Sequence, residues 1–196
     1  MTSYQGKKRS ARLLARSECH PMVLKLKRTP GIYLVGFMAA GKTTVGRLLA
    51  DRLGWKFADL DEDIEQAEGR RISEIFDTRG EEEFRRIEHD AVTKRVRAIE
   101  RGCPTVVALG GGAFNEMKNR TLLTENGITV WLDCAFDRVC ARLAGSSHRP
   151  LARDGEKFAE LYQQRQSTYS QAEFRVEVVS DDPGDTVEAI LALPVF

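Results

Sequence analysis

The residues best suited to chemistry form one phosphate-binding motif. Residues 36–43 read GFMAAGKT and match the P-loop pattern G-x-x-x-x-G-K-[ST] at every fixed position. An apolar run precedes the motif, and residues 43–50 continue with the apolar spacing of a helix. A loop between a strand and a helix directs backbone N–H groups and the positive end of the helix dipole at a phosphate. The motif predicts a nucleoside triphosphate site, with Lys42 on the β- and γ-phosphates and Thr43 on Mg²⁺.

Two acids stand at the end of the next predicted strand. Asp59 and Asp61 are two residues apart, so at the end of an extended strand their side chains would project the same way. One acid could hold the hydration shell of the metal ion while the other meets an acceptor hydroxyl. The alternative is that Asp61 only caps the helix that contains Ile64. The two roles are compatible, and the spacing alone does not separate them.

A run of three glycines stands where P-loop enzymes usually carry a second acid, at the end of the third strand. Residues 106–109 are apolar, and Gly110, Gly111 and Gly112 follow them. Because this position offers no carboxylate, Asp59 must supply the acid near Mg²⁺. Glycine permits close approach to the backbone, so the run predicts contact with a ligand. A plain loop is the alternative.

Arginines supply the remaining candidates. Arg85 and Glu88 lie one turn apart on a predicted helix and can reach each other. They form either a surface ion pair or an arginine fork that Glu88 orients toward a carboxylate. The polar segment 145–151 is typical of a mobile lid, in which Arg149 closes over phosphates and excludes water. An ordinary loop is the alternative for this segment.

Together these motifs resemble the shikimate kinase family. The resemblance rests on the P-loop, the Asp59 and Asp61 pair, the run EFRRIE at residues 83–88, the three glycines and the run RPL at residues 149–151, in that family's order and spacing. It extends from residue 32 to the C-terminal helix. It implies a nucleoside-monophosphate-kinase-like fold. It also implies transfer of the ATP γ-phosphate to the 3-hydroxyl of shikimate, a step of aromatic amino-acid (chorismate) synthesis.

The resemblance also implies roles for individual residues. Asp61 would bind the shikimate hydroxyls and position or deprotonate the nucleophile, Arg85 and Arg165 would grip the shikimate carboxylate, and Gly111 would donate a backbone N–H. The loop around Pro183 would flank adenine. The implied catalytic residues are Lys42, Asp61 and Arg149; the ATP-binding residues are Ala39, Ala40, Gly41, Lys42, Thr43, Thr44, Arg142, Arg149 and Pro183; and Thr43 and Asp59 hold the metal.

The chain departs from the family pattern at two places. Family members commonly have glycine in place of Ala39, so the loop is expected to be slightly stiffer here. The segment before Tyr169 often reads Pro-Leu-Tyr in the family, whereas Ser167 and Thr168 precede the tyrosine in this chain. The assignment of Arg165 therefore rests on an arginine and a tyrosine four residues apart.

The elements must bring these residues to one place. Apolar runs alternate with helical stretches from residue 32 onward. The alternation predicts an α/β fold, with a parallel sheet and helices on both faces. Together with the resemblance, it implies a three-layer P-loop kinase fold with a five-stranded parallel sheet and a mobile lid. Ligands gather at the carboxyl ends of such strands. Predicted strands cover residues 32–35, 55–60, 105–109, 128–132 and 175–179, and predicted helices cover residues 42–53, 61–68, 81–100, 136–143, 157–172 and 186–193.

Composition and charge limit the remaining possibilities. The 196 residues suit one domain at residues 31–196 behind a leader at residues 1–30. The leader holds eight basic residues and one acid, hence +7 in a chain of net charge +1, which leaves −6 for the rest. We expect it to be either a flexible leader or residues upstream of a true start at Met22; an arm for RNA, membrane or a partner is the alternative. No apolar run approaches the ~20 residues of a membrane span.

Composition also bears on the compartment, and the motifs and the resemblance imply the substrates. The four cysteines lack zinc-like pairing, which favours a reducing cytoplasm. We expect a monomer that binds ATP and shikimate and neither nucleic acid nor membrane. Gluconate kinase or another small sugar-acid kinase of the same fold is a rival. A regulatory GTP switch is disfavoured because the chain has no Asn-Lys-x-Asp sequence.

Overall fold

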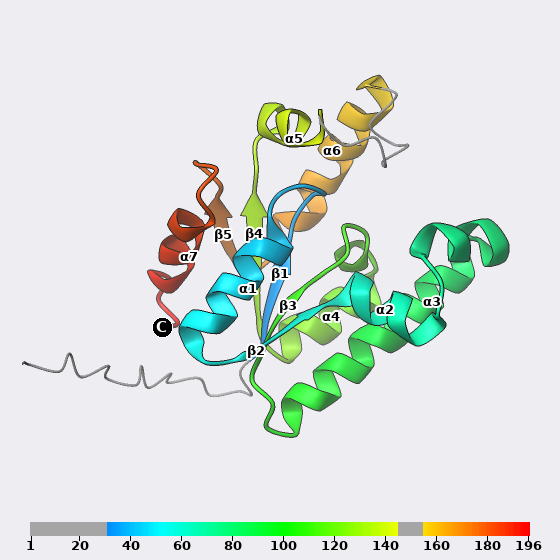
Figure 1. Cartoon of the computed structure of the whole chain (residues 1–196), viewed down its shortest axis with the longest axis horizontal. Helices are drawn as coiled ribbons and strands as arrows, with labels where there is room; N and C mark the ends of the chain where they lie inside the picture. Colours follow the sequence, from blue (N-terminus) through cyan, green and yellow to red (C-terminus); the bar gives the residue numbers. More distant parts are fainter. Residues whose placement is uncertain (1–30, 145–154) are drawn as a thin grey trace, which may run out of the picture.

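A computed structural model describes residues 31–144 and 155–196. The predicted leader and the predicted lid, with Arg149, lie outside these residues. Five strands form one all-parallel sheet in the order β2-β3-β1-β4-β5 (Figure 1). The predicted fold class is therefore confirmed. The strands are β1 (Gly31–Val35), β2 (Lys56–Asp59), β3 (Thr105–Ala108), β4 (Ile128–Asp133) and β5 (Phe174–Glu177).

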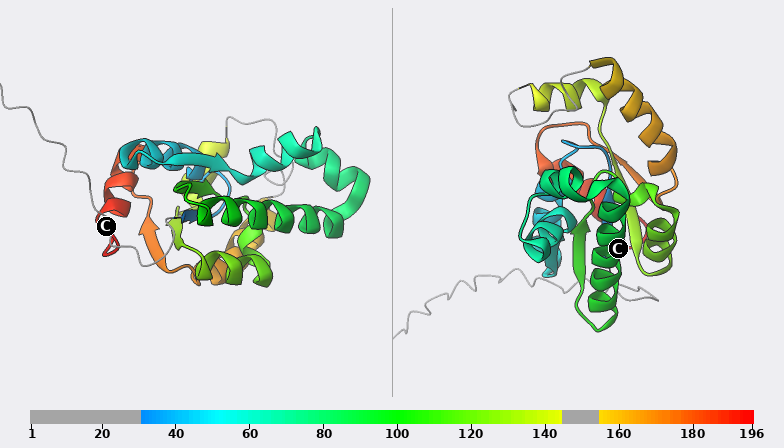
Figure 2. Two further views of the ribbon diagram at one scale, coloured as in Figure 1. Left: turned by 90° about the horizontal axis from the view of Figure 1, so that it is seen from below. Right: turned by 90° about the vertical axis from the view of Figure 1, so that its right-hand side faces the viewer.

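Helices cover both faces of this sheet. Helices α1 and α7 pack against each other on one face, and α3 and α4 pack against each other on the other (Figures 1 and 2). Helices α1 and α2 each end at a glycine in the left-handed region, Gly54 and Gly69. The helices are α1 (Lys42–Leu53), α2 (Leu60–Glu68), α3 (Ile72–Glu100), α4 (Met117–Glu125), α5 (Phe136–Leu143), α6 (Gly155–Tyr169) and α7 (Pro183–Leu191), with a 3-10 turn η1 (Ala113–Asn115).

Two helical segments differ from the sequence-based expectation. Helix α3 begins at Ile72 rather than at residue 81, with a non-helical backbone at Gly80 where φ is 79° and ψ is 174°. Helix α4 is not predicted because its buried positions are Asn119 and Leu123 instead of an apolar stripe. Elsewhere the predicted and observed boundaries differ by up to three residues, and Leu60 begins α2 rather than ending β2.

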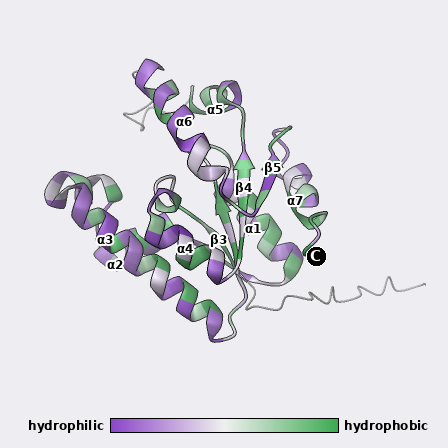
Figure 3. Ribbon diagram, turned by 180° about the vertical axis from the view of Figure 1, so that it is seen from behind, coloured by the Kyte–Doolittle hydropathy of each residue, from purple (hydrophilic) through white to green (hydrophobic). Residues whose placement is uncertain are grey.

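The core lies between the sheet and its helices. All five residues of β1 and all four of β3 are buried, as expected for central strands covered on both faces. Figure 3 shows β3 and β4 in hydrophobic colours and much of α2, α3 and α6 in hydrophilic ones. Gly46 on α1 lies against the ring of Phe57, where a Cβ would approach Cε2 to 2.5 Å. This glycine therefore lets α1 pack closely against β2.

The strand register brings the functional loops to one edge. Asp59 pairs with Ala108, Leu34 also pairs with Ala108, and Val35 pairs with Trp131. The loops after all five strands therefore start at nearly the same level, at the upper edge of the sheet in Figure 1. The motifs found in the sequence sit in these loops, at the position where parallel α/β sheets bind ligands.

Candidate active site

The P-loop connects β1 to α1 and has the backbone that a phosphate site requires. Gly36, Ala39 and Gly41 have positive φ angles of 146°, 59° and 99°. A Cβ at Gly36 would lie 2.7 Å from the Leu132 carbonyl oxygen, so only glycine fits there. Lys42 Nζ donates to the carbonyl oxygens of Gly36 at 2.8 Å and Phe37 at 2.9 Å. The lysine thus lies along the loop that it is predicted to serve.

The start of α1 suits an anion. Its N-cap is Gly41, which has no side chain to accept from the first turn, and that first turn contains no acidic residue. An anion in the loop would accept from these backbone N–H groups and would be favoured by the helix dipole. The geometry of the loop therefore fits the predicted phosphate site.

Asp59 joins the P-loop to α2. Thr43 Oγ1 donates to Asp59 Oδ2 at 2.7 Å, and the backbone N–H of Asp61 donates to Asp59 Oδ1 at 3.1 Å. Asp59 is therefore the N-cap of α2, and Asp61 lies in its first turn. The alternative in which Asp61 only caps this helix is wrong, and the two acids do not extend from one strand as their spacing suggested.

The pair formed by Thr43 and Asp59 suits a hard cation. A hydroxyl and a carboxylate oxygen lie 2.7 Å apart beside the P-loop, and Mg²⁺ prefers such oxygen ligands. In the part of the chain that the structure describes, no group of three or more His, Cys, Asp or Glu side chains could hold a metal. Mg²⁺ in nucleotide sites generally uses one or two protein ligands together with phosphates and water.

The three glycines make room for the side chains of other elements. A Cβ at Gly110 would overlap Asp61 Oδ1, and a Cβ at Gly112 would lie 2.5 Å from Arg85 Nη1. Asp61 from α2 and Arg85 from α3 therefore both lie against the backbone of this turn. Arg95 Nε donates to Asp63 Oδ2 at 3.0 Å and so connects α3 to α2. The turn, Asp61 and Arg85 form one cluster, which we call the glycine-turn cluster.

A buried acid orients Arg85. Arg85 Nη1 donates to Glu88 Oε2 at 2.8 Å, and Arg85 Nη2 donates to Glu81 at 3.2 Å. Glu88 is 1% exposed, so the pair is not the surface ion pair that the sequence left open. Burial raises the pKa of Glu88, while its hydrogen bond with Arg85 opposes that rise. Burial lowers the pKa of Arg85, but Glu88 and Glu81 more than offset this and raise it.

Helix α6 brings Arg165 near the same cluster. The hydroxyl of Tyr169 donates to the Gly111 carbonyl oxygen at 2.6 Å. Arg165 lies one helical turn earlier, and its charge acts on the Tyr169 hydroxyl. The four-residue spacing of arginine and tyrosine thus places Arg165 on the glycine-turn side of the molecule. Its predicted contact with a carboxylate stays a prediction.

A cavity of about 330 Å³ opens beside the P-loop and the loop after β5. Six of the residues predicted to bind ATP line it: Ala39, Ala40, Gly41, Thr44, Arg142 and Pro183. Val178, Ser180, Asp181 and Thr186 also line the cavity, and sequence reasoning did not single them out. They follow a short strand and carry no motif, so only the fold reveals them.

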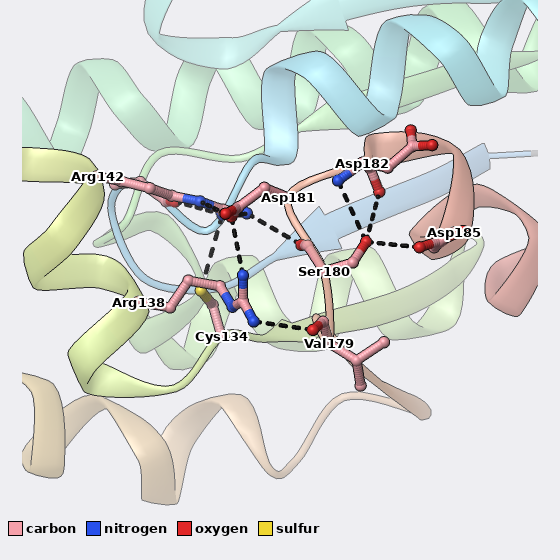
Figure 4. A network of polar contacts seen from close by, with 9 residues as sticks. Cys134, Arg138, Arg142, Val179, Ser180, Asp181, Asp182 and Asp185 are labelled. Carbon is pink, nitrogen blue, oxygen red and sulfur yellow. Dashed lines mark hydrogen bonds and ion pairs between the residues drawn. The ribbon is translucent and has the colours of Figure 1, made fainter.

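Arg142, on α5, connects two loops at this cavity (Figure 4). Its guanidinium donates to the Ala39 carbonyl oxygen at 3.0 Å, to the Ser180 carbonyl oxygen at 3.4 Å and to Asp181 Oδ1 at 3.0 Å. Arg138, one turn earlier on α5, donates to the same Asp181 oxygen at 2.9 Å. These hydrogen bonds lower the pKa of Asp181. Arg142 thereby holds the P-loop next to the loop after β5, and its contact with a nucleotide stays a prediction.

The fold and this edge of the sheet define a P-loop kinase. Among the described residues, no helix has the length and apolar composition needed to cross a membrane. The profile of the shikimate kinase family matches residues 38–193. The chain belongs to the shikimate kinase family, which confirms the resemblance seen in the sequence.

Relatives agree with this assignment. The shikimate kinase of Sulfurihydrogenibium sp. is 40% identical over 161 residues, which covers 82% of this chain and 95% of that protein. The shikimate kinase of Geobacter metallireducens is 42% identical over 164 residues and covers 82% and 87%. The structure of Acinetobacter baumannii shikimate kinase in complex with shikimate has a TM-score of 0.75 at 36% identity, covering 83% of this chain and 90% of that one.

More distant structures share the fold alone. A gluconokinase from Sinorhizobium meliloti matches with a TM-score of 0.52 at 20% identity. Its coverage is 85% of this chain and 92% of that chain. A likeness at this identity describes the arrangement of the sheet and helices and does not identify the acceptor.

Proposed function

We propose that this chain uses ATP to phosphorylate the 3-hydroxyl of shikimate, giving shikimate 3-phosphate and ADP. The observation that carries the proposal is the position of Asp61 and Arg85 against the two ends of one glycine turn. A carboxylate can order a hydroxyl, and a guanidinium can bind a carboxylate by two parallel hydrogen bonds. The two groups bound in this way, a hydroxyl and a carboxylate, are those of a hydroxy acid. The relative solved in complex with shikimate supports this choice of acceptor.

The nucleotide would lie along the P-loop. In this proposal the adenine occupies the cavity between Arg142 and Pro183, and the phosphates accept from the first N–H groups of α1. Lys42 then neutralises charge that develops on the transferred phosphoryl group. Arg149 would add a second positive charge; it lies outside the described residues, so its role rests on the resemblance alone.

The acceptor would lie in the glycine-turn cluster. Asp61 aligns the 3-hydroxyl for attack, and Arg85, supported by Arg165, binds the carboxylate at the far side of the ring. The backbone N–H of Gly111 supplies a further donor. Holding both reactants in this way makes the transfer effectively unimolecular, which is the main contribution of a kinase site.

Mg²⁺ would be held by Thr43 and Asp59. When bound with ATP it would neutralise negative charge on the phosphates. In this proposal the two acids divide the work, with Asp59 on the metal side and Asp61 on the acceptor side. Asp59→Asn should raise the Mg²⁺ concentration required for half-maximal rate, whereas Asp61→Asn should lower kcat and leave that requirement unchanged. Equal metal dependence in both variants would contradict this division.

A coupled ADP-release assay tests the function directly. Purified protein receives ATP and Mg²⁺ with shikimate, with gluconate or without acceptor. We expect ADP release that depends on shikimate, and phosphorus NMR should place the new phosphate on the 3-hydroxyl. Release with gluconate but not with shikimate would instead assign the chain to the sugar-acid kinases of the same fold.

A further inference from the structure

Tyr169 makes a contact that the proposed mechanism does not use. This tyrosine ends α6 and is 1% exposed. Its hydroxyl donates to the carbonyl oxygen of Gly111 at 2.6 Å, across 58 residues of sequence. Its ring packs near Trp131 with centroids 6.4 Å apart. A buried hydroxyl thus bonds to the middle residue of the three glycines.

The glycine turn depends on this bond. The carbonyl oxygens of Gly110 and Gly112 accept from Ala113 N at 3.2 Å and Asn115 N at 3.0 Å, both within the turn itself. The middle carbonyl accepts from Tyr169. Because glycine allows a wide range of backbone angles, three in succession do not fix their own geometry. The hydroxyl of Tyr169 fixes the peptide group between Gly111 and Gly112, which lies between the groups contacted by Asp61 and Arg85.

The same bond positions α6. Arg165 lies one turn before Tyr169, so an anchor at the end of the helix also places the Arg165 backbone. Burial raises the pKa of Tyr169 to about 12, and the nearby charge of Arg165 only partly opposes the rise. The hydroxyl therefore keeps its proton, and with it the hydrogen bond, throughout the neutral range.

We propose that Tyr169 is a positioning residue for the acceptor: its hydroxyl fixes the glycine turn and the end of α6 relative to each other. Asp61, Arg85 and Arg165 come from three different helices, and this bond sets the distance between the third of them and the first two. The inference rests on the proposed function, since it concerns the acceptor side of that site.

Tyr162 offers a matched control on the same helix. It precedes Tyr169 by two turns, and its hydroxyl also donates to a backbone carbonyl, that of Cys134, at 3.0 Å. Its ring packs on Phe37 and Phe136, with centroids 5.2 Å and 5.1 Å away. The two tyrosines thus make the same kind of bond at different places, Tyr162 at the end of β4 and Tyr169 at the glycine turn.

The test compares Tyr169→Phe with Tyr162→Phe. Both changes keep the ring and remove one hydroxyl, and circular dichroism confirms that both variants are folded at the assay temperature. In Tyr169→Phe we expect the KM for shikimate to rise roughly 3- to 30-fold, the range for losing one buried hydrogen bond. The KM for ATP should stay within about twofold of wild type, as expected when only acceptor binding is lost. In Tyr162→Phe the KM for shikimate should stay within about twofold as well.

A double-variant cycle asks whether Tyr169 acts through Arg165. If it does, Tyr169→Phe should raise the KM for shikimate less in an Arg165→Ala background than in wild type. An unchanged KM for shikimate in Tyr169→Phe would overturn the inference, as would equal rises in both KM values. Failure of the proposed function would appear differently, because the wild type itself would then release no ADP in response to shikimate.

Discussion

Two adjacent arginines on α3 have opposite surroundings. Arg85 lies against Gly112 and is bonded to the buried Glu88. Arg86 is exposed and forms hydrogen bonds with Glu83 at 2.7 Å and Asp90 at 3.2 Å. One residue of sequence thus separates an arginine of the candidate site from an arginine of the surface. The pair is a natural variant and control.

Loss of Arg85 should weaken binding of the acceptor. Hydrogen bonds to a charged group contribute about 1.5–3 kcal/mol, so Arg85→Ala should raise the KM for shikimate roughly 10- to 100-fold at about 1.4 kcal/mol per decade. The KM for ATP should remain near wild type. Arg85→Lys should recover part of the loss, because a point charge does not reproduce the planar fork. Steady-state kinetics with each substrate varied measures these changes.

Arg86→Ala is the control, and its KM for shikimate should match wild type. Shikimate methyl ester, which lacks the carboxylate charge, should be a poor acceptor for wild type. The KM for this ester should differ little between wild type and Arg85→Ala. If Arg86→Ala raised the KM for shikimate as much as Arg85→Ala, the carboxylate contact would have to be reassigned.

Glu88 should make acceptor binding depend on pH. Burial raises its pKa, so Glu88 becomes protonated at a higher pH than the ~4.3 of an ordinary glutamate. Below that raised pKa, Arg85 loses a charged partner, and the KM for shikimate should rise as the pH falls. Glu88→Gln should have a higher KM at neutral pH and should lack this part of the pH dependence. A wild-type profile identical to that of Glu88→Gln would contradict the role of Glu88.

The same shift has a consequence for stability. Because the folded-state pKa of Glu88 is raised, the folded protein binds this proton more readily than the unfolded chain does. Ionised Glu88 therefore opposes folding at neutral pH. This cost decreases as the pH falls from the raised pKa of the folded state to the ordinary glutamate pKa of the unfolded chain. The Tm of wild type relative to Glu88→Gln should increase over that interval, which calorimetry at several pH values would show.

At the scale of elements, the sequence predicted most of the sheet and its edge. Alternating apolar runs located all five strands, and α1 and α5 begin and end at the predicted residues. Helix α4 was not predicted because the buried side of a helix need not be apolar. Its Asn119 is fully buried and forms hydrogen bonds with His89 and with the Ala113 carbonyl oxygen. Contacts such as that of Tyr169 with Gly111 join distant segments, and no local pattern encodes them.

The glycine turn should be sensitive at its two ends. A Cβ at Gly110 or Gly112 would meet the ends of the Asp61 and Arg85 side chains, which can move away without disturbing the core. Gly110→Ala should therefore mainly lower kcat, and Gly112→Ala should mainly raise the KM for shikimate. Steady-state kinetics with shikimate varied measures both changes. The same pattern of kcat and KM in the two variants would contradict this account.

The P-loop carries backbone strain at Ala39. Its φ of 59° lies in the left-handed region, which costs an L-residue roughly 1–2 kcal/mol. Ala39→Gly removes this strain. It also raises the conformational entropy of the unfolded chain, which lowers the free energy of unfolding by about 0.4–1 kcal/mol. The Tm should therefore equal or exceed that of wild type. Ala40, which is 1% exposed and does not have a positive φ, is the control. Ala40→Gly should lower the Tm, and a larger loss in Ala39→Gly would contradict the strain argument.

At the scale of the whole molecule, the candidate site can be compared with the predicted leader at residues 1–30. The candidate site residues all belong to residues 31–196, and β1 starts at Gly31. Deleting residues 1–30 should therefore leave kcat and both KM values within about twofold of wild type. Activity assays on the shortened chain test this. A large loss of activity in a folded protein would place the leader in the site.

The opposite net charges of the leader and the remainder suggest a second measurement on the same deletion, the salt dependence of RNA binding. The leader carries +7 and the remainder −6. RNA binding that weakens steeply with salt and disappears with residues 1–30 would favour the arm over a plain leader. The expectation that the chain acts as a monomer stays a prediction, and sedimentation velocity of both forms would test it.

Asp59 has one further consequence, which concerns the two substrates together. One of its oxygens accepts from Thr43 on the nucleotide side, and the other accepts from the backbone of Asp61 on the acceptor side. A ligand that changes the first bond therefore acts on the carboxylate that begins α2. Any free energy transmitted in this way is reciprocal: ATP would change the affinity for shikimate by the same factor by which shikimate changes the affinity for ATP. Calorimetric titration with shikimate and with a non-hydrolysable ATP analogue, each in the presence and absence of the other ligand, would measure that factor. Asp59→Asn should bring it closer to one.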